Sequence, residues 1–279
     1  MKLMRVGEPG RERPALLGND GLLRDLSGVV QDINGAALAD MSWAQNLDAN
    51  RLPAIEGTPR IGPCVNSIGK FVAIGLNYAD HAAETGAPIP DEPIVFMKAT
   101  SSIVGPNSDV IIPKGSTKTD WEVELGVVIA REARYVEKAD ALEYIAGYCV
   151  VNDVSERAYQ LEMGGQWIKG KSADTFGPIG PWLVTRDEVR DPQDLYLWLE
   201  VDGHRYQNGS TRTMIFDVAT IVSYVSQFMS LQPGDLITTG TPPGVGLGQK
   251  PAVFLQPGQI MRLGVEGLGE QMQRVVAYE

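Results

Sequence analysis

The segment 119–129, near the middle of the sequence, contains two glutamates separated by a single residue, Glu122 and Glu124. The segment alternates as a β-strand does, so Trp121 and Val123 are expected to face a core while both glutamates share the opposite face. Two carboxylates in this position are roughly 6.6 Å apart by strand rise. At an effective dielectric of about 20 they repel by about 2.5 kcal/mol. A bound cation would relieve that repulsion, and the alternative is that both carboxylates face water.

A third carboxylate, Asp153, follows the apolar run 145–152, which is expected to be a buried strand. Ser155 and Glu156 are expected to begin a helix directly after it. Functional groups commonly gather at the ends of strands, and the chain contains only 2 histidines. Three carboxylates therefore predict a site for Mg²⁺, Mn²⁺ or Ca²⁺, and not a zinc site built from histidine and cysteine.

The two histidines have different surroundings. His81 belongs to the alanine-rich segment 76–84, a predicted short helix on which it shares a face with Glu84. The alternative for this pair is a solvated helix surface. His204 is expected to be a surface residue, because it lies in a hairpin-like turn without an acidic neighbour on a matching face.

Lys171 lies in the segment 169–178, which is expected to be a loop because it is rich in glycine and polar residues. A lysine in such a loop is usually solvated. Beside an acidic metal site, it would instead anchor a substrate anion.

The elements that must position these residues fall into two predicted units. Residues 1–68 are expected to form a small amino-terminal domain, and residues 69–279 a larger catalytic domain, with the proline- and glycine-containing stretch 52–63 as the connection. In the first unit, the patterns predict strands at 3–6, 15–17 and 22–26 and a helical segment at 38–47.

In the second unit, the patterns predict more strand than helix, hence an α+β fold. Strands are expected at 70–75, 94–98, 119–129, 145–152, 195–201, 205–206, 236–239, 253–255 and 260–265, and helices at 138–144 and after Asp217, with Phe228 on the buried face of the second. The glycines of 240–246 do not predict a nucleotide site, because no Gly-Lys-Ser/Thr follows them.

The net charge and the composition limit which classes of partner and which cellular location are expected for this protein. The net charge of -11 and the lack of any basic run exclude nucleic acid as an expected partner. No apolar stretch approaches the roughly 20 residues that span a membrane, and the amino terminus lacks the apolar core of a signal peptide. Cys64 and Cys149 stand apart without a CxxC pair, which indicates a reducing compartment, and we expect a cytoplasmic protein.

Five short motifs in order resemble the fumarylacetoacetate hydrolase family across residues 68–279. The motifs are Gly75-Leu76-Asn77-Tyr78 with His81 and Glu84, Glu122-x-Glu124, Asn152-Asp153-x-Ser155, Gly170-Lys171-Ser172, and Thr239-Gly240-Thr241-Pro242. The amino-terminal segment resembles shorter bacterial members, among them hydrolases of 2,4-diketo-3-deoxy sugar acids such as L-2,4-diketo-3-deoxyrhamnonate.

The resemblance implies a fold, an assembly and a role for each residue. The fold would be a mixed β-sheet roll around a central metal site, assembled as a homodimer. Glu122, Glu124 and Asp153 would bind Mg²⁺, for which Mn²⁺ or Ca²⁺ could substitute. His81 and Glu84 would activate water, Lys171 would serve catalysis and substrate binding, and Gln160 and Thr241 would hold substrate. Arg157 is a weaker candidate beside Gln160.

These residues would support hydrolysis of a carbon–carbon bond in a 2,4-diketo acid, an acylpyruvate-type anion, as in sugar-acid catabolism. A metal bound by the keto-acid end polarises the oxygens on which enolate charge develops. Histidine is a suitable base for water, since an unperturbed imidazole titrates at about 6.5. Decarboxylases of oxaloacetate and keto–enol isomerases of the 2-hydroxyhepta-2,4-diene-1,7-dioate type use the same metal chemistry and remain alternatives. A non-catalytic binder of carboxylates or carbohydrates would not explain a His-Glu pair beside a metal.

Overall fold

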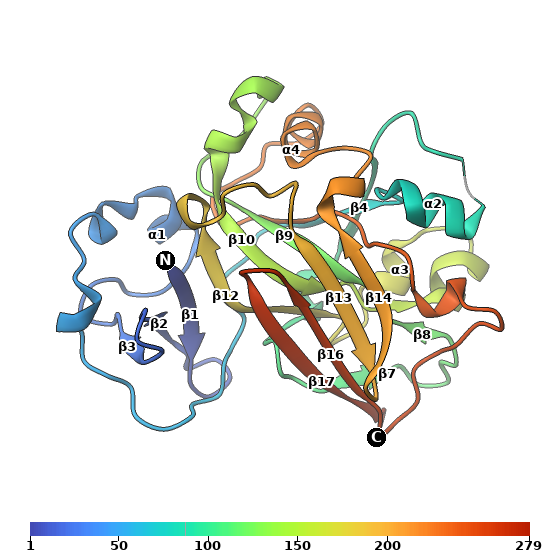
Figure 1. Cartoon of the computed structure of the whole chain (residues 1–279), viewed down its shortest axis with the longest axis horizontal. Helices are drawn as coiled ribbons and strands as arrows, with labels where there is room; N and C mark the ends of the chain where they lie inside the picture. The colour runs from blue at the N-terminus through green and yellow to red at the C-terminus, as the bar shows by residue number, and fades with distance from the viewer. Residues whose placement is uncertain (87) are drawn as a thin grey trace.

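The structure, a computed structural model, describes residues 1–86 and 88–279, and within them short helices join three β-sheets (Figure 1). A ten-stranded sheet has the order β3-β2-β1-β12-β10-β9-β15-β4-β5, with β6 paired to β12. A five-stranded sheet has the order β14-β13-β16-β17-β7, and β8 and β11 form a separate pair. The predicted β-rich α+β class is confirmed.

The ten-stranded sheet consists of β1 (Lys2–Val6), β2 (Arg13–Leu17), β3 (Leu23–Asp25), β4 (Phe71–Gly75), β5 (Ile94–Lys98), β6 (Ile103–Val104), β9 (Val123–Ile129), β10 (Ile145–Asn152), β12 (Gly177–Thr185) and β15 (Leu236–Thr238). The five-stranded sheet consists of β7 (Val110–Ile112), β13 (Tyr196–Val201), β14 (His204–Ser210), β16 (Ile260–Val265) and β17 (Gly269–Ala277). The small pair is β8 (Thr119–Asp120) and β11 (Ser155–Glu156).

The α-helices are α1 (Gly35–Ala39), α2 (Ala79–Thr85), α3 (Ile168–Lys171) and α4 (Val218–Ser226). A π-helical segment, η5 (Ala158–Glu162), and several 3₁₀ turns connect the other elements. The turns are η1 (Met41–Ala44), η2 (Ala49–Arg51), η3 (Thr100–Ser102), η4 (Lys138–Tyr144), η6 (Arg186–Glu188), η7 (Thr211–Thr213) and η8 (Gly246–Gly248).

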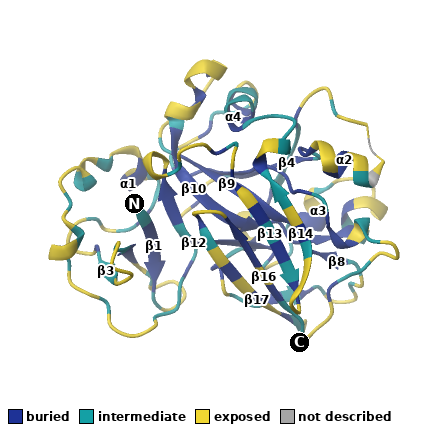
Figure 2. Cartoon of the chain, viewed as in Figure 1, coloured by how far each residue is buried: buried dark blue, intermediate teal, exposed yellow. Residues whose placement is uncertain are grey.

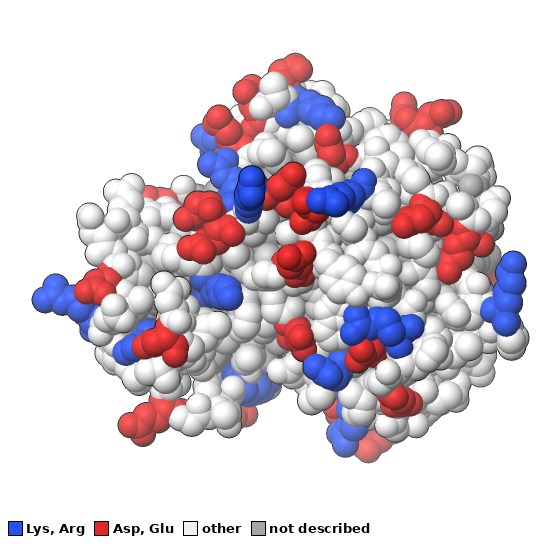
Figure 3. Space-filling view, viewed as in Figure 1, with Lys and Arg blue, Asp and Glu red and all other residues white. Residues whose placement is uncertain are grey.

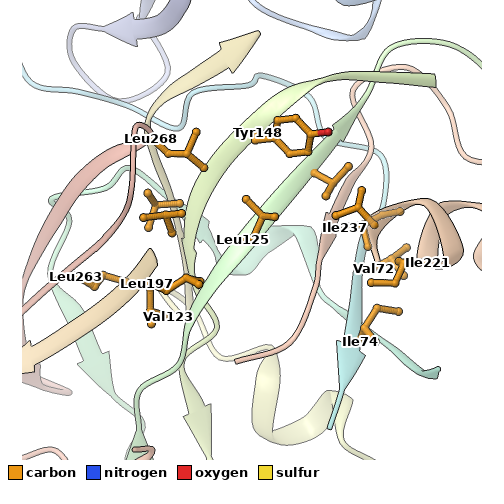
Figure 4. Packing of buried hydrophobic residues seen from close by; sticks show 14 of the residues in the cluster. Val72, Ile74, Val123, Leu125, Tyr148, Leu197, Ile221, Ile237, Leu263 and Leu268 are labelled. Atoms are coloured by element: carbon orange, nitrogen blue, oxygen red, sulfur yellow. The ribbon is translucent and has the colours of Figure 1, made fainter. Parts of the chain in front are cut away.

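The core lies between β9 and the five-stranded sheet. Figure 4 shows Val123 of β9 near Leu197 of β13 and Leu263 of β16, with Leu125 further along β9, and all four side chains are fully buried. Burying one such side chain stabilises the fold by about 1.5–3 kcal/mol. Because strand side chains alternate, fixing this face of β9 in the core turns Glu124 to the opposite face.

Helix α4 packs against β4 and β15 of the ten-stranded sheet. Its Ile221 lies beside Val72 and Ile237 in Figure 4, as expected for the apolar stripe of the helix. The predicted helix after Asp217 is confirmed, and Asp217 is its N-cap, because its carboxylate accepts a hydrogen bond from the backbone N–H of Thr220 at 2.7 Å. Phe228 was expected on this buried face; that prediction is wrong, because α4 ends at Ser226 and Phe228 is 66% exposed.

The amino-terminal unit continues the ten-stranded sheet. Strand β1 pairs with β12, so β1 to β3 extend the sheet at one side of the molecule (Figure 1). Leu3, Leu16 and Leu183 are buried in one cluster across this junction. The division into residues 1–68 and 69–279 stays a prediction.

Three other local predictions are wrong, each for a physical reason. The residues Ser155 and Glu156 form β11, because they pair with β8, and the helical backbone begins only at Arg157. Part of the predicted loop 169–178 is helical, since α3 ends at Lys171. Residues 253–255 are not a strand; Leu255 instead hydrogen-bonds to Thr119 as part of a connection.

Figure 2 shows that β9 and β10 are buried, whereas β13, β14, β16 and β17 carry exposed residues, as do the helices and connections. On the face shown in Figure 3, lysine and arginine side chains are interspersed with aspartate and glutamate. None of the helices in the described part of the chain has the length and apolar character to cross a membrane.

Candidate metal centre and active site

The three predicted carboxylates come together at adjacent strands. Strands β9 and β10 are antiparallel neighbours, and the backbone N–H of Asp153 donates to the carbonyl oxygen of Glu122 at 2.9 Å. One carboxylate oxygen from each of Glu122, Glu124 and Asp153 lies within 4.8 Å of the others. All three side chains are buried. An all-oxygen set of this kind suits a hard divalent cation.

Glu124 is the carboxylate that a cation would compensate. It accepts hydrogen bonds from the Thr238 hydroxyl at 2.5 Å and the Gly240 N–H at 2.8 Å. Within the described part of the chain, it forms no ion pair with lysine or arginine. Burial, followed by the nearby charges of Asp153 and Glu122, raises the pKa of Glu124 well above its usual value. A divalent cation between the three carboxylates would reverse this effect, so the donor set fits such an ion.

Glu122 has the opposite surroundings. Arg157 donates to it at 2.7 Å and Lys171 at 2.6 Å. Burial alone would raise the pKa of Glu122, but the charges of Lys171 and then Arg157 outweigh it and lower that pKa to about 2. Lys171 also donates to Asp153 at 2.7 Å, so its ammonium group bridges two of the three carboxylates. The predicted role of Lys171 beside the acidic cluster is therefore geometrically possible.

His81 and Glu84 lie together on α2, as their spacing predicts. His81 Nδ1 is 3.0 Å from Glu84 Oε2. The Glu84 carboxylate also accepts the Gly244 N–H at 3.0 Å, so it ties the helix to the loop after β15. The helix ends at Thr85, and its C-cap is Gly86, whose φ of 67° is the left-handed conformation that glycine adopts readily.

A second contact brings two motifs to the carboxylate cluster. The side-chain amide of Asn77 donates to the Thr239 carbonyl at 2.8 Å and thereby joins the segment after β4 to the segment after β15. Gly240 has φ of 93°, and a Cβ there would lie 2.8 Å from the Asn77 Cβ. Glycine at this position lets the backbone N–H reach Glu124.

A cavity of about 230 Å³ lies over these groups. Of the predicted site residues, it is lined by His81, Glu122, Glu124, Gln160, Lys171 and Thr241, and Arg157 lines it too. The Thr241 hydroxyl donates to the Val123 carbonyl at 2.9 Å and accepts from Gln207 at 2.7 Å. His204 lies elsewhere, exposed and 4.4 Å from the Tyr206 ring, as expected of a surface residue.

Two residues of this centre were not predicted. Lys98, at the end of β5, is 1% exposed and donates to Asp153 at 2.5 Å. Asp120 accepts from Arg157 at 2.8 Å and from the Gly246 N–H at 2.6 Å. The signal for Asp120 was present, because Asp120, Glu122 and Glu124 alternate along the chain. A lysine that ends an apolar strand was the signal for Lys98.

Comparison with known proteins agrees with this architecture. The family model "Fumarylacetoacetate (FAA) hydrolase C-terminal" matches residues 70–276. A protein of Burkholderia multivorans, provisionally named a hydrolase, is 66% identical over 276 residues, which are 98% of each chain. The fold and the acidic centre thus define an enzyme with a candidate metal site. The chain belongs to the fumarylacetoacetate hydrolase family.

Two solved structures place the fold within that family. The chain is similar to fumarylacetoacetate hydrolase from Exiguobacterium antarcticum, with a TM-score of 0.90, 35% identity and full coverage of both chains. It is also similar to maleylpyruvate hydrolase from Sphingobium sp. SYK-6, with a TM-score of 0.82, 26% identity and full coverage of both chains. That structure is described as a complex with manganese(II) ion and pyruvate.

Proposed function

We propose that the protein is a hydrolase that uses Mg²⁺, or Mn²⁺ in its place, to cleave a 2,4-diketo acid. The reaction converts R–CO–CH₂–CO–COO⁻ and water into R–COO⁻, pyruvate and a proton. The observation that carries this proposal is that His81, whose Nδ1 lies 3.0 Å from the Glu84 carboxylate, lines the same cavity as Glu122 and Glu124. A base beside a cation site is what water attack on a carbonyl needs.

The divalent cation would be held by Glu122, Glu124 and Asp153, and when bound it would polarise the keto-acid oxygens as a Lewis acid. His81, oriented by Glu84, takes a proton from water as the oxygen attacks the C4 carbonyl. The C3–C4 bond then breaks, its electron pair stays on C3, and C3 takes up a proton. Lys171 provides positive charge for the substrate anion, and Gln160 and Thr241 line the space that it occupies.

The Glu122–Glu124–Asp153 cluster alone would also serve a decarboxylase or a keto–enol isomerase, but neither of these reactions requires delivery of water to a carbonyl. The His81–Glu84 pair is therefore the reason to prefer hydrolysis. The finer expectations remain part of this proposal: a 2,4-diketo-3-deoxy sugar acid as substrate, a homodimer, and a cytoplasmic location.

A test is to assay the Mg²⁺-loaded protein against 2,4-diketo acids, oxaloacetate and a 2-hydroxy-2,4-diene dioate. The proposal predicts pyruvate release from a diketo acid and no other turnover of comparable efficiency. Release of CO₂ from oxaloacetate as the dominant reaction would instead support the decarboxylase.

Lys171→Met is expected to separate substrate binding from metal binding. The Lys171 ammonium lies 2.6 Å from Glu122 and 2.7 Å from Asp153, so it repels a cation bound by the same carboxylates. We expect kcat/KM to fall by at least about tenfold, since the substrate anion loses a charged contact. Calorimetric titration should show Mg²⁺ binding as tight as in the parent or tighter. Unchanged kcat/KM would remove Lys171 from the site.

A further inference from the structure

The cavity over the carboxylate cluster has a charged base and an apolar mouth. Glu122 and Glu124, at the base, are 6% and 2% exposed. Leu161 and Leu247, which also line the cavity, are 48% and 38% exposed and therefore lie at its opening to solvent. A substrate whose keto-acid end binds at the base would extend its other end towards these leucines.

Aromatic rings complete the apolar wall. Trp167 and Phe96 line the cavity and pack edge to face, with ring centroids 5.3 Å apart. The indole lies over Gly75, where an added Cβ would be 2.9 Å from the Trp167 Cη2. Gly75 thus allows the ring to form part of the wall.

The lysine and arginine side chains that line the cavity form ion pairs with carboxylates at its base. Among the described residues that line the cavity, lysine and arginine are represented by Lys171 and Arg157. Lys171 is paired with Glu122 and Asp153, and Arg157 donates to Asp120, Glu122 and Gln160. The mouth therefore offers no lysine or arginine from the described lining to a second carboxylate.

An end group of the substrate that packs against Leu161, Leu247 and Trp167 gives up part of its contact with water without gaining a lysine or arginine from the described lining. A buried carboxylate or hydroxyl without a partner is costly, whereas burial of hydrocarbon is favourable in proportion to its area. The lining thus discriminates by the chemistry of the acyl end and not by the keto-acid end, which all diketo acids share.

We propose that the acyl group of the substrate is uncharged and ends in hydrocarbon, held between Leu161, Leu247 and Trp167. This inference rests on the proposed function and adds the substrate class. Among sugar acids, it selects those that end in a methyl group over those that end in a hydroxymethyl group or a carboxylate. Dioates are poor substrates.

The first test compares two diketo acids of equal chain length, 2,4-dioxoheptanoate and 2,4-dioxoheptanedioate, with the Mg²⁺-loaded protein. We expect kcat/KM for the methyl-ended acid to be higher by about tenfold to a hundredfold, the range that a hydrophobic pocket achieves. Equal values, or a preference for the dioate, would overturn the inference while leaving the hydrolase proposal intact.

A positive charge placed at the mouth should weaken this preference for the methyl-ended acid. Leu161→Arg is expected to shift the ratio of the two kcat/KM values by at least about tenfold towards the dioate, because the guanidinium pairs with its second carboxylate. Met163→Arg is the matched control: Met163 is 51% exposed and close in sequence but does not line the cavity. An equal shift in both variants would show that general charge, and not the mouth, decides.

A binding measurement separates this inference from the proposed reaction. 2-Oxohexanoate and 2-oxoadipate have six carbons each, and neither has the C4 ketone that water would attack in a diketo acid. We expect calorimetry with the Mg²⁺-loaded protein to give at least about tenfold tighter binding of 2-oxohexanoate. If this preference holds while no diketo acid is hydrolysed, the proposed reaction fails and the apolar subsite stands. Tighter binding of 2-oxoadipate, equal binding, or no binding of either acid would overturn the inference.

Discussion

Replacing His81 by alanine is expected to lower the rate of diketo acid hydrolysis by about 10² to 10⁴, the usual contribution of a general base. His81 lines the cavity that Glu122 and Glu124 also line, and its Nδ1 lies 3.0 Å from the Glu84 carboxylate, which orients the ring. His204→Ala is the matched control, because the second histidine of the chain is exposed and packs against Tyr206. Its kinetics should equal those of the parent.

The same variant distinguishes loss of the base from loss of the site. His81→Ala should still exchange the C3 methylene protons of a diketo acid with deuterated solvent when Mg²⁺ is present. Glu84→Ala should slow hydrolysis through the ring that it orients, so the double variant should be no slower than His81→Ala alone. Hydrolysis at the parental rate in His81→Ala would contradict the assigned role.

Replacing Glu124 by glutamine is expected to abolish metal-dependent activity while the metal-free fold becomes more stable at neutral pH. Even residues that only support metal ligands change metal affinity by about 10- to 100-fold when mutated, so loss of a ligand should exceed that. Glu124 is a better choice than Glu122, because Glu122→Gln would remove one of the two carboxylate partners of the buried Arg157 and of the buried Lys171.

The stability effect follows from the raised pKa of Glu124. A folded-state pKa above the unfolded value means that the folded state binds the extra proton, so the contribution of Glu124 to stability falls as pH rises from the unfolded pKa to the folded pKa. Urea unfolding of metal-free protein should therefore show a decline with pH in this window that Glu124→Gln reduces. Addition of Mg²⁺ should stabilise the parent and leave the variant unchanged. An equal Mg²⁺ effect on both would contradict the metal assignment.

Local patterns in the sequence were sufficient to predict most of the elements that carry the site. Alternation predicted that Trp121 and Val123 enter the core and that Glu124 faces away. The spacing of His81 and Glu84 predicted their contact. The strand before Asp153 was predicted because its residues are apolar without interruption. Each of these features is set by the pattern of residues close together in the chain, and such a pattern can be read from the sequence.

The features that were missed depend on contacts between distant segments. Ser155 and Glu156 form a strand because β8 lies beside them, which no local pattern shows. Lys98 reaches Asp153 across 55 positions in the sequence, and Asp120 reaches the Gly246 N–H across 126. The apolar mouth combines Leu161, Trp167 and Leu247 from three segments, so its chemistry appears only when the chain is folded.

The most direct test of the proposed reaction follows oxygen from water into the product. Metal-stripped protein is incubated with 2,4-dioxoheptanoate in H₂¹⁸O, Mg²⁺ is then added, and pyruvate and butyrate are measured by mass spectrometry. The proposal predicts pyruvate and singly labelled butyrate in equal amounts, formed only after Mg²⁺ is added and prevented by a chelator. Equal rates without metal, or CO₂ in place of pyruvate, would contradict metal-dependent hydrolysis.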